Sequence, residues 1–210
     1  MRTRTAVLFV ATLFVAFVSS TPAPAATAYT NLASFLGALT NSYTENFGGI
    51  TNTNSTFTVA PQNFSGNGMS FSANTQPTPN GLWTIVNGET KWLSVLNTGS
   101  SLAFTLTSGN ITAVGGNFFM TDFAGIFIEG GTIDILFSDS TSTNWAPPSA
   151  SDFIGFVFDT PVTSMTLSPV ASDQYVTAGT IIVGQVPEPS TYALLLITGA
   201  GALWWTRRRR

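Results

Sequence analysis

The chain of 210 residues contains neither cysteine nor histidine, and these two absences exclude several kinds of site. Without cysteine no disulfide can form, so the fold depends on noncovalent packing alone. Histidine is the most frequent general base near neutral pH and a common ligand of transition metals. Zinc, haem and iron–sulfur centres therefore lack their usual ligands here. Ser/His/Asp and Cys/His catalytic arrangements are excluded for the same reason.

Basic residues are almost missing from the middle of the chain. Between residues 29 and 186, nine acids face a single base, Lys91, which leaves a net charge of −8. The six arginines all lie near the two ends of the sequence. An acidic surface with one cation repels phosphate backbones, so the composition excludes nucleic acid as a partner.

The first 28 residues have the order of a cleavable signal peptide. Arg2 and Arg4 precede an apolar run, Ala6–Val18, and a stretch of small residues and prolines follows it. The apolar run has 13 residues, whereas a stable membrane span needs about 20. We therefore expect cleavage rather than permanent anchoring. Cleavage can follow Ala25, Ala26 or Ala28, and the Ala26-Thr27-Ala28 site is favoured.

Residues 29–186 are enough for one domain with a sizeable core. Short runs of β-branched and aromatic residues recur through them, separated by turn signals such as Ser108-Gly109-Asn110 and Glu129-Gly130-Gly131. Leu102, Phe104 and Leu106 alternate with smaller residues at a period of two. This pattern predicts an all-β fold, an antiparallel β-sandwich that is jelly-roll-like. The expected strands include Trp83–Val86, Trp92–Val95, Leu102–Leu106, Ile126–Glu129, Thr132–Phe137 and Tyr175–Val183. The expected core phenylalanines are Phe104, Phe118, Phe119, Phe137, Phe153, Phe156 and Phe158.

One segment near the start of this domain has a helical period. Four apolar residues follow a possible cap at Thr30 or Asn31 with the spacing i, i+3, i+4 and i+7: Leu32, Phe35, Leu36 and Leu39. We expect a short amphipathic helix that lies across one open end of the sandwich.

The C-terminal region predicts one transmembrane helix. Ser190–Thr206 is apolar and uncharged, and its 17 residues make about 25 Å of helix. Trp204 and Trp205 stand at its end, where aromatic side chains favour the membrane interface. Basic residues stay on the cytoplasmic side of a membrane and set the topology, and four end the chain: Arg207, Arg208, Arg209 and Arg210. Residues 29–186 are therefore expected outside the inner membrane.

The block Val186–Thr191 contains the tripeptide Pro187, Glu188 and Pro189. With the apolar helix and the arginine tail in order behind it, residues 187–210 resemble the PEP-CTERM sorting signal. The resemblance implies a Gram-negative bacterium and processing near the tripeptide by exosortase, a membrane-embedded cysteine protease-transpeptidase. It also implies transient anchoring in the inner membrane, then residence at the cell surface or in the extracellular matrix. Proteins of this class are associated with exopolysaccharide and biofilm.

The middle of the chain resembles domains that commonly precede this signal. The matching segments are Thr44–Gly49, Ile111–Phe119, Phe153–Phe156 and Val162–Leu167. The resemblance implies a jelly-roll sandwich related in shape to carbohydrate-binding modules. In those domains the last strand carries an Asp-Asn or Asp-Asp pair, where this chain has Ala178-Gly179-Thr180. A metal ligand supplied by that pair would be missing.

A structural calcium ion is the cofactor that the remaining acids allow, and no other cofactor is expected. Calcium takes six to eight oxygen ligands, and carboxylates often supply them in the loops of sandwiches. The candidate ligands are Glu45, Asp122, Asp159 and Asp173. The alternative is that these acids are unpaired and solvated.

Extracellular polysaccharide is a candidate partner because flat aromatic side chains can pack on sugar rings. Trp145 lies in an expected polar loop, Thr141–Pro148, and is the candidate platform, whereas Trp83 and Trp92 lie in apolar runs and are expected in the core. A glycosidase would instead need two carboxylates about 5–9 Å apart, such as Asp122 with Glu129 or Asp134 with Asp139. Three functions stay open: a non-enzymatic surface or matrix protein that binds glycans, a secreted carbohydrate-active enzyme, and a structural or adhesive protein.

Overall fold

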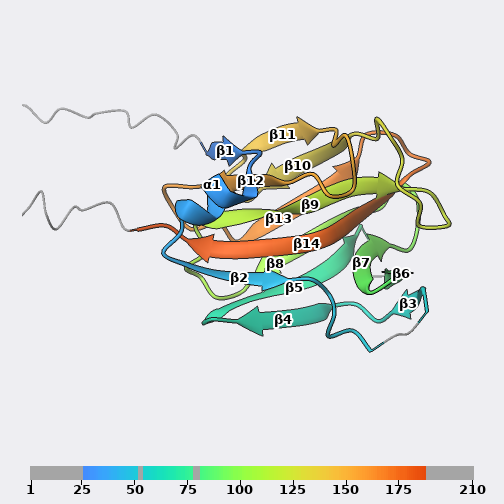
Figure 1. Cartoon of the computed structure of the whole chain (residues 1–210), viewed down its shortest axis with the longest axis horizontal. Coiled ribbons are helices and arrows are strands. Elements are labelled where there is room, and N and C mark those ends of the chain that lie inside the picture. The colour runs from blue at the N-terminus through green and yellow to red at the C-terminus, as the bar shows by residue number, and fades with distance from the viewer. Residues whose placement is uncertain (1–25, 52–53, 78–80, 188–210) are drawn as a thin grey trace, which may run out of the picture.

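The computed structural model describes residues 26–51, 54–77 and 81–187, and it has two antiparallel β-sheets packed as a sandwich (Figure 1). One sheet has eight strands in the order β1-β12-β9-β14-β7-β6-β3, with β2 also paired to β14. The other has six strands in the order β11-β10-β13-β8-β5-β4. The predicted β-sandwich is therefore confirmed.

Most strands are short, as the spacing of turn signals predicts, whereas β5, β9 and β14 are longer. The eight-stranded sheet contains β1 (Thr27–Tyr29), β2 (Asn41–Glu45), β3 (Thr56–Thr58), β6 (Leu82–Asn87), β7 (Thr90–Val95), β9 (Ala113–Thr121), β12 (Ile154–Val157) and β14 (Tyr175–Gln185). The six-stranded sheet contains β4 (Gln62–Gly66), β5 (Met69–Gln76), β8 (Ser101–Leu106), β10 (Ile133–Phe137), β11 (Ser142–Trp145) and β13 (Ser164–Pro169).

The main core lies between the two sheets and is filled by every second side chain of the strands. In β8 the inward residues are Leu102, Phe104 and Leu106, as the period-two pattern predicts. All seven phenylalanines that the sequence assigns to the interior are buried. Two of them, Phe119 and Phe153, are buried outside this main core. The eight-stranded sheet is therefore covered on both faces.

The predicted helix is present as α1 (Leu32–Gly37), and Asn31 caps it by accepting a hydrogen bond from the backbone N–H of Ser34 at 2.9 Å. Its position differs from the prediction. Phe35 is fully buried in a second cluster with Ala113, Phe153 and Ile182, so α1 covers the outer face of the eight-stranded sheet rather than an open end. Phe35 therefore faces a sheet surface made of small and apolar residues, whereas Leu32 and Leu36 of the predicted apolar stripe are exposed.

The N-terminal boundary of the domain also differs from the expected one. Thr27 and Ala28 pair with Val157 and Phe156 of β12, and Ala26 packs against the main core. Residues 26–28 thus belong to the sandwich, although the sequence assigns them to the signal peptide. Strand pairing, which no local signal reveals, sets this boundary.

The two predicted membrane-directed segments fall largely outside the described residues. These are the first 25 residues of the signal peptide and everything after Pro187 in the sorting signal. The latter includes Glu188, Pro189, the expected transmembrane segment 190–206 and the predicted topology tail of Arg207, Arg208, Arg209 and Arg210. Within the described ranges no helix is long and apolar enough to cross a membrane.

Strand β14 lies in the middle of the eight-stranded sheet and organises it. It pairs with β9 along its whole length, with β7 near Thr177 and with β2 from Ile181 to Gln185. The register with β9 shifts between Ala178 and Thr180, which leaves Gly179 in a β-bulge. This bulge lies in the middle of the outer face, beside the depression described next.

Candidate functional site

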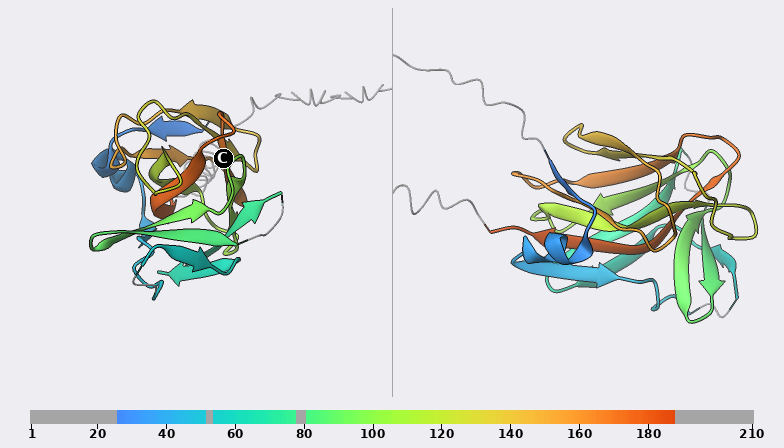
Figure 2. Two further views of the ribbon diagram at one scale, coloured as in Figure 1. Left: turned by 90° about the vertical axis from the view of Figure 1, so that its right-hand side faces the viewer. Right: turned by 45° about the horizontal axis from the view of Figure 1, so that its top comes forward.

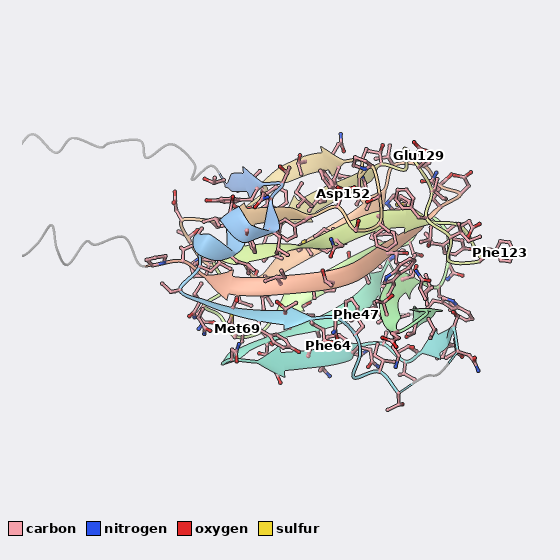
Figure 3. All side chains as sticks on the ribbon, in the orientation of Figure 1. Phe47, Phe64, Met69, Phe123, Glu129 and Asp152 are labelled. Carbon is pink, nitrogen blue, oxygen red and sulfur yellow. The ribbon has the colours of Figure 1, made fainter. Side chains whose placement is uncertain are left out.

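A depression of about 380 Å³ lies on the outer face of the eight-stranded sheet. Its floor is formed by Trp92 of β7, Asn117 of β9 and the bulge of β14. These side chains point outward because their chain neighbours, Leu93 and Phe118, belong to the main core. Two loops form the walls, one before β12 and one after β2. Asp152 of the first loop lies over the face of the sheet (Figure 3).

The indole of Trp92 is held in place from one side and open on another. It packs edge-to-face against Phe119, with 4.9 Å between the ring centroids and an interplanar angle of 80°. Next to it, the bulge residue Gly179 has no side chain. A Cβ built there would lie 3.5 Å from Trp92 and 3.3 Å from Phe119. The glycine therefore leaves space beside the aromatic ring that any other residue would fill.

Asn117 fixes one wall of the depression through its side-chain amide. Its Nδ2 donates to the carbonyl oxygens of Ser151 and Asp152 at 2.8 and 3.1 Å. Its Oδ1 accepts a hydrogen bond from the hydroxyl of Thr180. The carboxylate of Asp152 in turn accepts hydrogen bonds from the backbone N–H and hydroxyl of Ser149, at 2.6 and 2.8 Å. The loop is thereby held against the sheet by polar contacts.

The opposite wall brings charges of both signs to the depression. Lys91, the single base between residues 29 and 186, donates from Nζ to the carbonyl oxygen of Ile50. Glu89 lies in the turn between β6 and β7 and is exposed. Asn46 accepts a hydrogen bond from the N–H of Gly48 at 3.0 Å. Among the residues lining the depression, Glu89 is the single acid.

Glu45, a predicted calcium ligand, has a structural role in the backbone after β2. One carboxylate oxygen accepts from the N–H of Phe47 at 2.6 Å, and the other accepts from the hydroxyl of Tyr43. Burial, followed by the hydrogen bond to Glu45 and the negative charge of that residue, raises the pKa of Tyr43 to about 12. Phe47 is fully buried and has a φ of 59°, in the left-handed region. Glu45 therefore stabilises a strained turn that buries an aromatic ring.

The other predicted calcium ligands are not gathered around Glu45. Asp122 uses one carboxylate oxygen to accept from the N–H groups of Ala124 and Ile126, both at 2.9 Å. Asp159 and Asp173 are exposed at the surface. Across residues 26–51, 54–77 and 81–187, no group of three or more acidic side chains is placed to hold a metal ion. The fold thus separates these four acids, with Glu45 at the end of β2 and the other three in loops.

The three tryptophans of the domain are placed differently from the prediction. Trp145 is half-buried on β11, packs against the core and donates its indole N–H to the carbonyl oxygen of Phe118 at 3.0 Å. It links the two sheets and does not line the depression. The sequence places Trp83 and Trp92 in the core, but both are half-exposed on the outer face. Their apolar neighbours Leu82 and Leu93 occupy the core instead.

Sequence reasoning does not select Asn117 or Gly179 as site residues. Successive side chains of β9 point to opposite faces of the sheet, so Asn117 lies on the face opposite the core residue Phe118. This alternation is a sequence signal that could have placed Asn117 on the outer face. Gly179 belongs to Ala178-Gly179-Thr180, the segment that replaces the acidic pair of the domains this one resembles. This difference in sequence therefore falls at a residue that lines the depression.

Comparison with known proteins identifies the C-terminal segment. A family model for the PEP-CTERM protein-sorting motif matches residues 185–210. The chain carries this sorting motif. The match contains the tripeptide that begins at Pro187 and the arginine tail of Arg207, Arg208, Arg209 and Arg210. The PEP-CTERM motif implies an exported, cell-surface-associated protein that is sorted and processed by exosortase.

The remaining comparisons do not extend beyond this motif. No curated protein matches the chain. A solved structure of a family two carbohydrate esterase from Cellvibrio japonicus is similar over 71% of this chain and 36% of its own, at 13% identity and a TM-score of 0.35. The chain thus corresponds to about a third of that protein. A TM-score of 0.35 does not indicate a shared fold.

Proposed function

We propose that this PEP-CTERM protein is a non-enzymatic component of the cell surface or extracellular matrix that binds polysaccharide in the depression beside Trp92. The observation that carries the proposal is an indole with free space at the Gly179 bulge. Fixed amide and hydroxyl groups of Asn117 and Thr180 flank it. A sugar ring has apolar C–H faces and polar edges, so it can pack on the indole and form hydrogen bonds around it.

The chemistry of the depression supports binding rather than cleavage. Glycoside hydrolysis uses two carboxylates about 5–9 Å apart, and Glu89 is the one acid among the lining residues. The sequence also has no histidine or cysteine to act as base or nucleophile. An open site on a sheet face, with an aromatic ring and several polar groups, is typical of a glycan-binding surface.

The sorting motif supplies the setting for this binding. We expect the apolar segment Ser190–Thr206 to hold the chain in the inner membrane of a Gram-negative bacterium until exosortase cuts near Pro187–Ser190. The domain then reaches the surface or the matrix, where exopolysaccharide of a biofilm is the expected ligand. The jelly-roll connectivity predicted from resemblance fits this function, because modules of that shape often bind carbohydrate.

The test is a glycan array followed by titration calorimetry with the full-length chain in detergent micelles. Trp92→Ala should weaken binding by about tenfold or more, equivalent to about 1.4 kcal/mol. Gly179→Ala should also weaken it by filling the space beside the indole. Trp83→Ala is the matched control, because Trp83 is a half-exposed tryptophan of the same sheet face outside the depression. Absence of binding to any glycan, or equal loss in the control, would contradict the proposal.

A further inference from the structure

The two ends of the described chain emerge at the same end of the sandwich. Thr27 of β1 pairs with Val157, Val157 pairs with Ala113, and Ala113 pairs with Gly184 of β14. These four residues form one row across the sheet, so the first strand and the last strand are about 14 Å apart at this edge. Figure 2 shows α1 beside the C-terminal end of β14. Segments directed to the membrane therefore both leave from this end.

The segment that connects the domain to the predicted membrane span is short. The carbonyl oxygen of Gln185 accepts hydrogen bonds from the N–H and hydroxyl of Thr40, at 2.8 and 3.1 Å. The N–H of Val186 donates to the hydroxyl of Thr112 at 2.9 Å. Ser190 is the first residue of the apolar segment and stands four positions further on. Four residues reach at most about 14 Å, so this end of the domain lies close to the start of the span.

Helix α1 carries exposed leucines next to this exit point. A Cβ on Gly184 would lie 2.6 Å from Leu39, just beyond the helix, so the segment that ends α1 contacts the last residues of β14. Phe35 fixes one side of the helix to the sheet. Leu32 and Leu36, one helical turn apart, are 44% and 39% exposed. Two large apolar side chains thus face solvent within reach of the membrane interface.

The segment that carries α1 is uncharged, although one exposed acid, Asp159, lies near the point where β14 ends. Residues 26–44 contain no charged side chain, whereas the nine acids follow from residue 45 onward. Anionic lipids give a membrane surface a negative potential, which repels acidic protein surfaces. Phe123 and Glu129 lie at the opposite end of the molecule (Figure 3), and Phe123 is 85% exposed there. The uncharged segment is therefore the part of the domain that such a bilayer repels least.

We propose that, while the C-terminal segment anchors the chain, α1 rests on the lipid surface with Leu32 and Leu36 in the headgroup region. The inference depends on the membrane span of the proposed function. The contact gives the tethered domain a fixed orientation. In this orientation the outer face of the eight-stranded sheet, with its depression, runs along the membrane normal.

The experiment uses the absence of cysteine, because a single introduced cysteine is the sole labelling site. The full chain is reconstituted into vesicles of phosphatidylethanolamine and phosphatidylglycerol, with an environment-sensitive fluorophore at Leu36→Cys. Leu32→Cys is a second position, and Phe123→Cys at the far end is the matched control. We expect a blue shift and quenching by lipid-chain quenchers at positions 36 and 32, and neither effect at position 123.

Each other outcome overturns the proposal in a distinguishable way. If the chain does not float with the vesicles, the predicted membrane span is wrong, and the proposed lipid contact, which depends on it, is wrong too. If the chain floats but the probe at position 36 behaves as in water, the span stands and the lipid contact is wrong. If position 36 is shielded only when exosortase is reconstituted with the chain, the surface binds that protein rather than lipid. Equal quenching at positions 36 and 123 would also contradict a fixed orientation.

Discussion

Replacing Phe35 by alanine should detach α1 from the sheet and destabilise the domain. The side chain is fully buried, packs against Phe153 with 5.2 Å between ring centroids and contacts Tyr29 edge-on at 5.9 Å. Phe→Ala changes in cores cost about 3–5 kcal/mol. Because this cluster is a small one on the outer face, the loss is limited by the free energy that docks α1. We expect about 3 kcal/mol, which lowers the Tm by about 6–12 °C for a domain of this size.

The glycine beneath Phe35 offers a second way to disturb the same contact. A Cβ at Gly155 would lie 2.7 Å from a ring carbon of Phe35 and 2.8 Å from Phe153, so Gly155→Ala pushes both rings outward. Such overpacking costs about 1–3 kcal/mol. In the Phe35→Ala background half of this collision is removed. The two changes should therefore be less than additive, by about 1 kcal/mol.

The assay is urea unfolding of residues 26–187, followed by tryptophan fluorescence. Gly37→Ala is the control on the same helix, because no atom lies within 4 Å of a Cβ at that position. It should leave stability unchanged or raise it by up to about 1 kcal/mol. A loss below about 1 kcal/mol for Phe35→Ala, or strict additivity with Gly155→Ala, would refute the account of α1 as a packed cover of the sheet.

Further predictions concern the Glu45 turn and the two ends of the chain. Glu45→Ala should lower the free energy of unfolding by about 1.5–3 kcal/mol, since the left-handed turn at residue 47 loses a charged acceptor; unchanged urea midpoints would contradict this. Because folding raises the pKa of Tyr43 from 10.0 to about 12, its contribution to stability is complete below pH 10 and is lost as the pH rises toward 12. Tyr43→Phe should flatten that part of the pH profile. Mass spectrometry of the mature protein should place its N-terminus at Ala26, because β1 begins at the next residue; a start at residue 29 would show that β1 is dispensable. Glu188→Ala should block C-terminal processing without affecting insertion, and intact wild-type chains accumulating beside active exosortase would refute the sorting role.

The sequence alone determined the class of the fold and the route of export. Period-two alternation in segments such as Leu102–Leu106 specifies strands with one inner face, because successive side chains point to opposite sides. The cap and spacing of α1 are equally local, and Asn31 is one of the two caps that the sequence offers. The sorting motif is contiguous, and its tripeptide, apolar run and arginine tail are readable in order. Each of these features depends on neighbours in the chain.

Local signals fail where a contact decides the structure. The pattern of Ile126–Glu129 predicts a strand, but this segment forms only an isolated antiparallel bridge, between Phe127 and Thr121. It belongs to a loop in which the carboxylate of Asp122 accepts from two backbone N–H groups. The apolar run Trp92–Val95 predicts a core position for Trp92, which is wrong. Alternation identifies two faces but not the inner one when both are covered, as α1 and the loops cover this sheet.

Only the tertiary structure decided where the candidate site lies. Its residues come from β7, β9, β14, the β6–β7 turn and two loops, and they span the chain from Asn46 to Thr180. They meet because β14 is inserted between β9 and β7 and bulges at Gly179. The same packing separates the four predicted calcium ligands and commits Glu45 to the turn at Phe47. The sequence gives the type of each residue, but the pairing of the strands determines which residues it contacts.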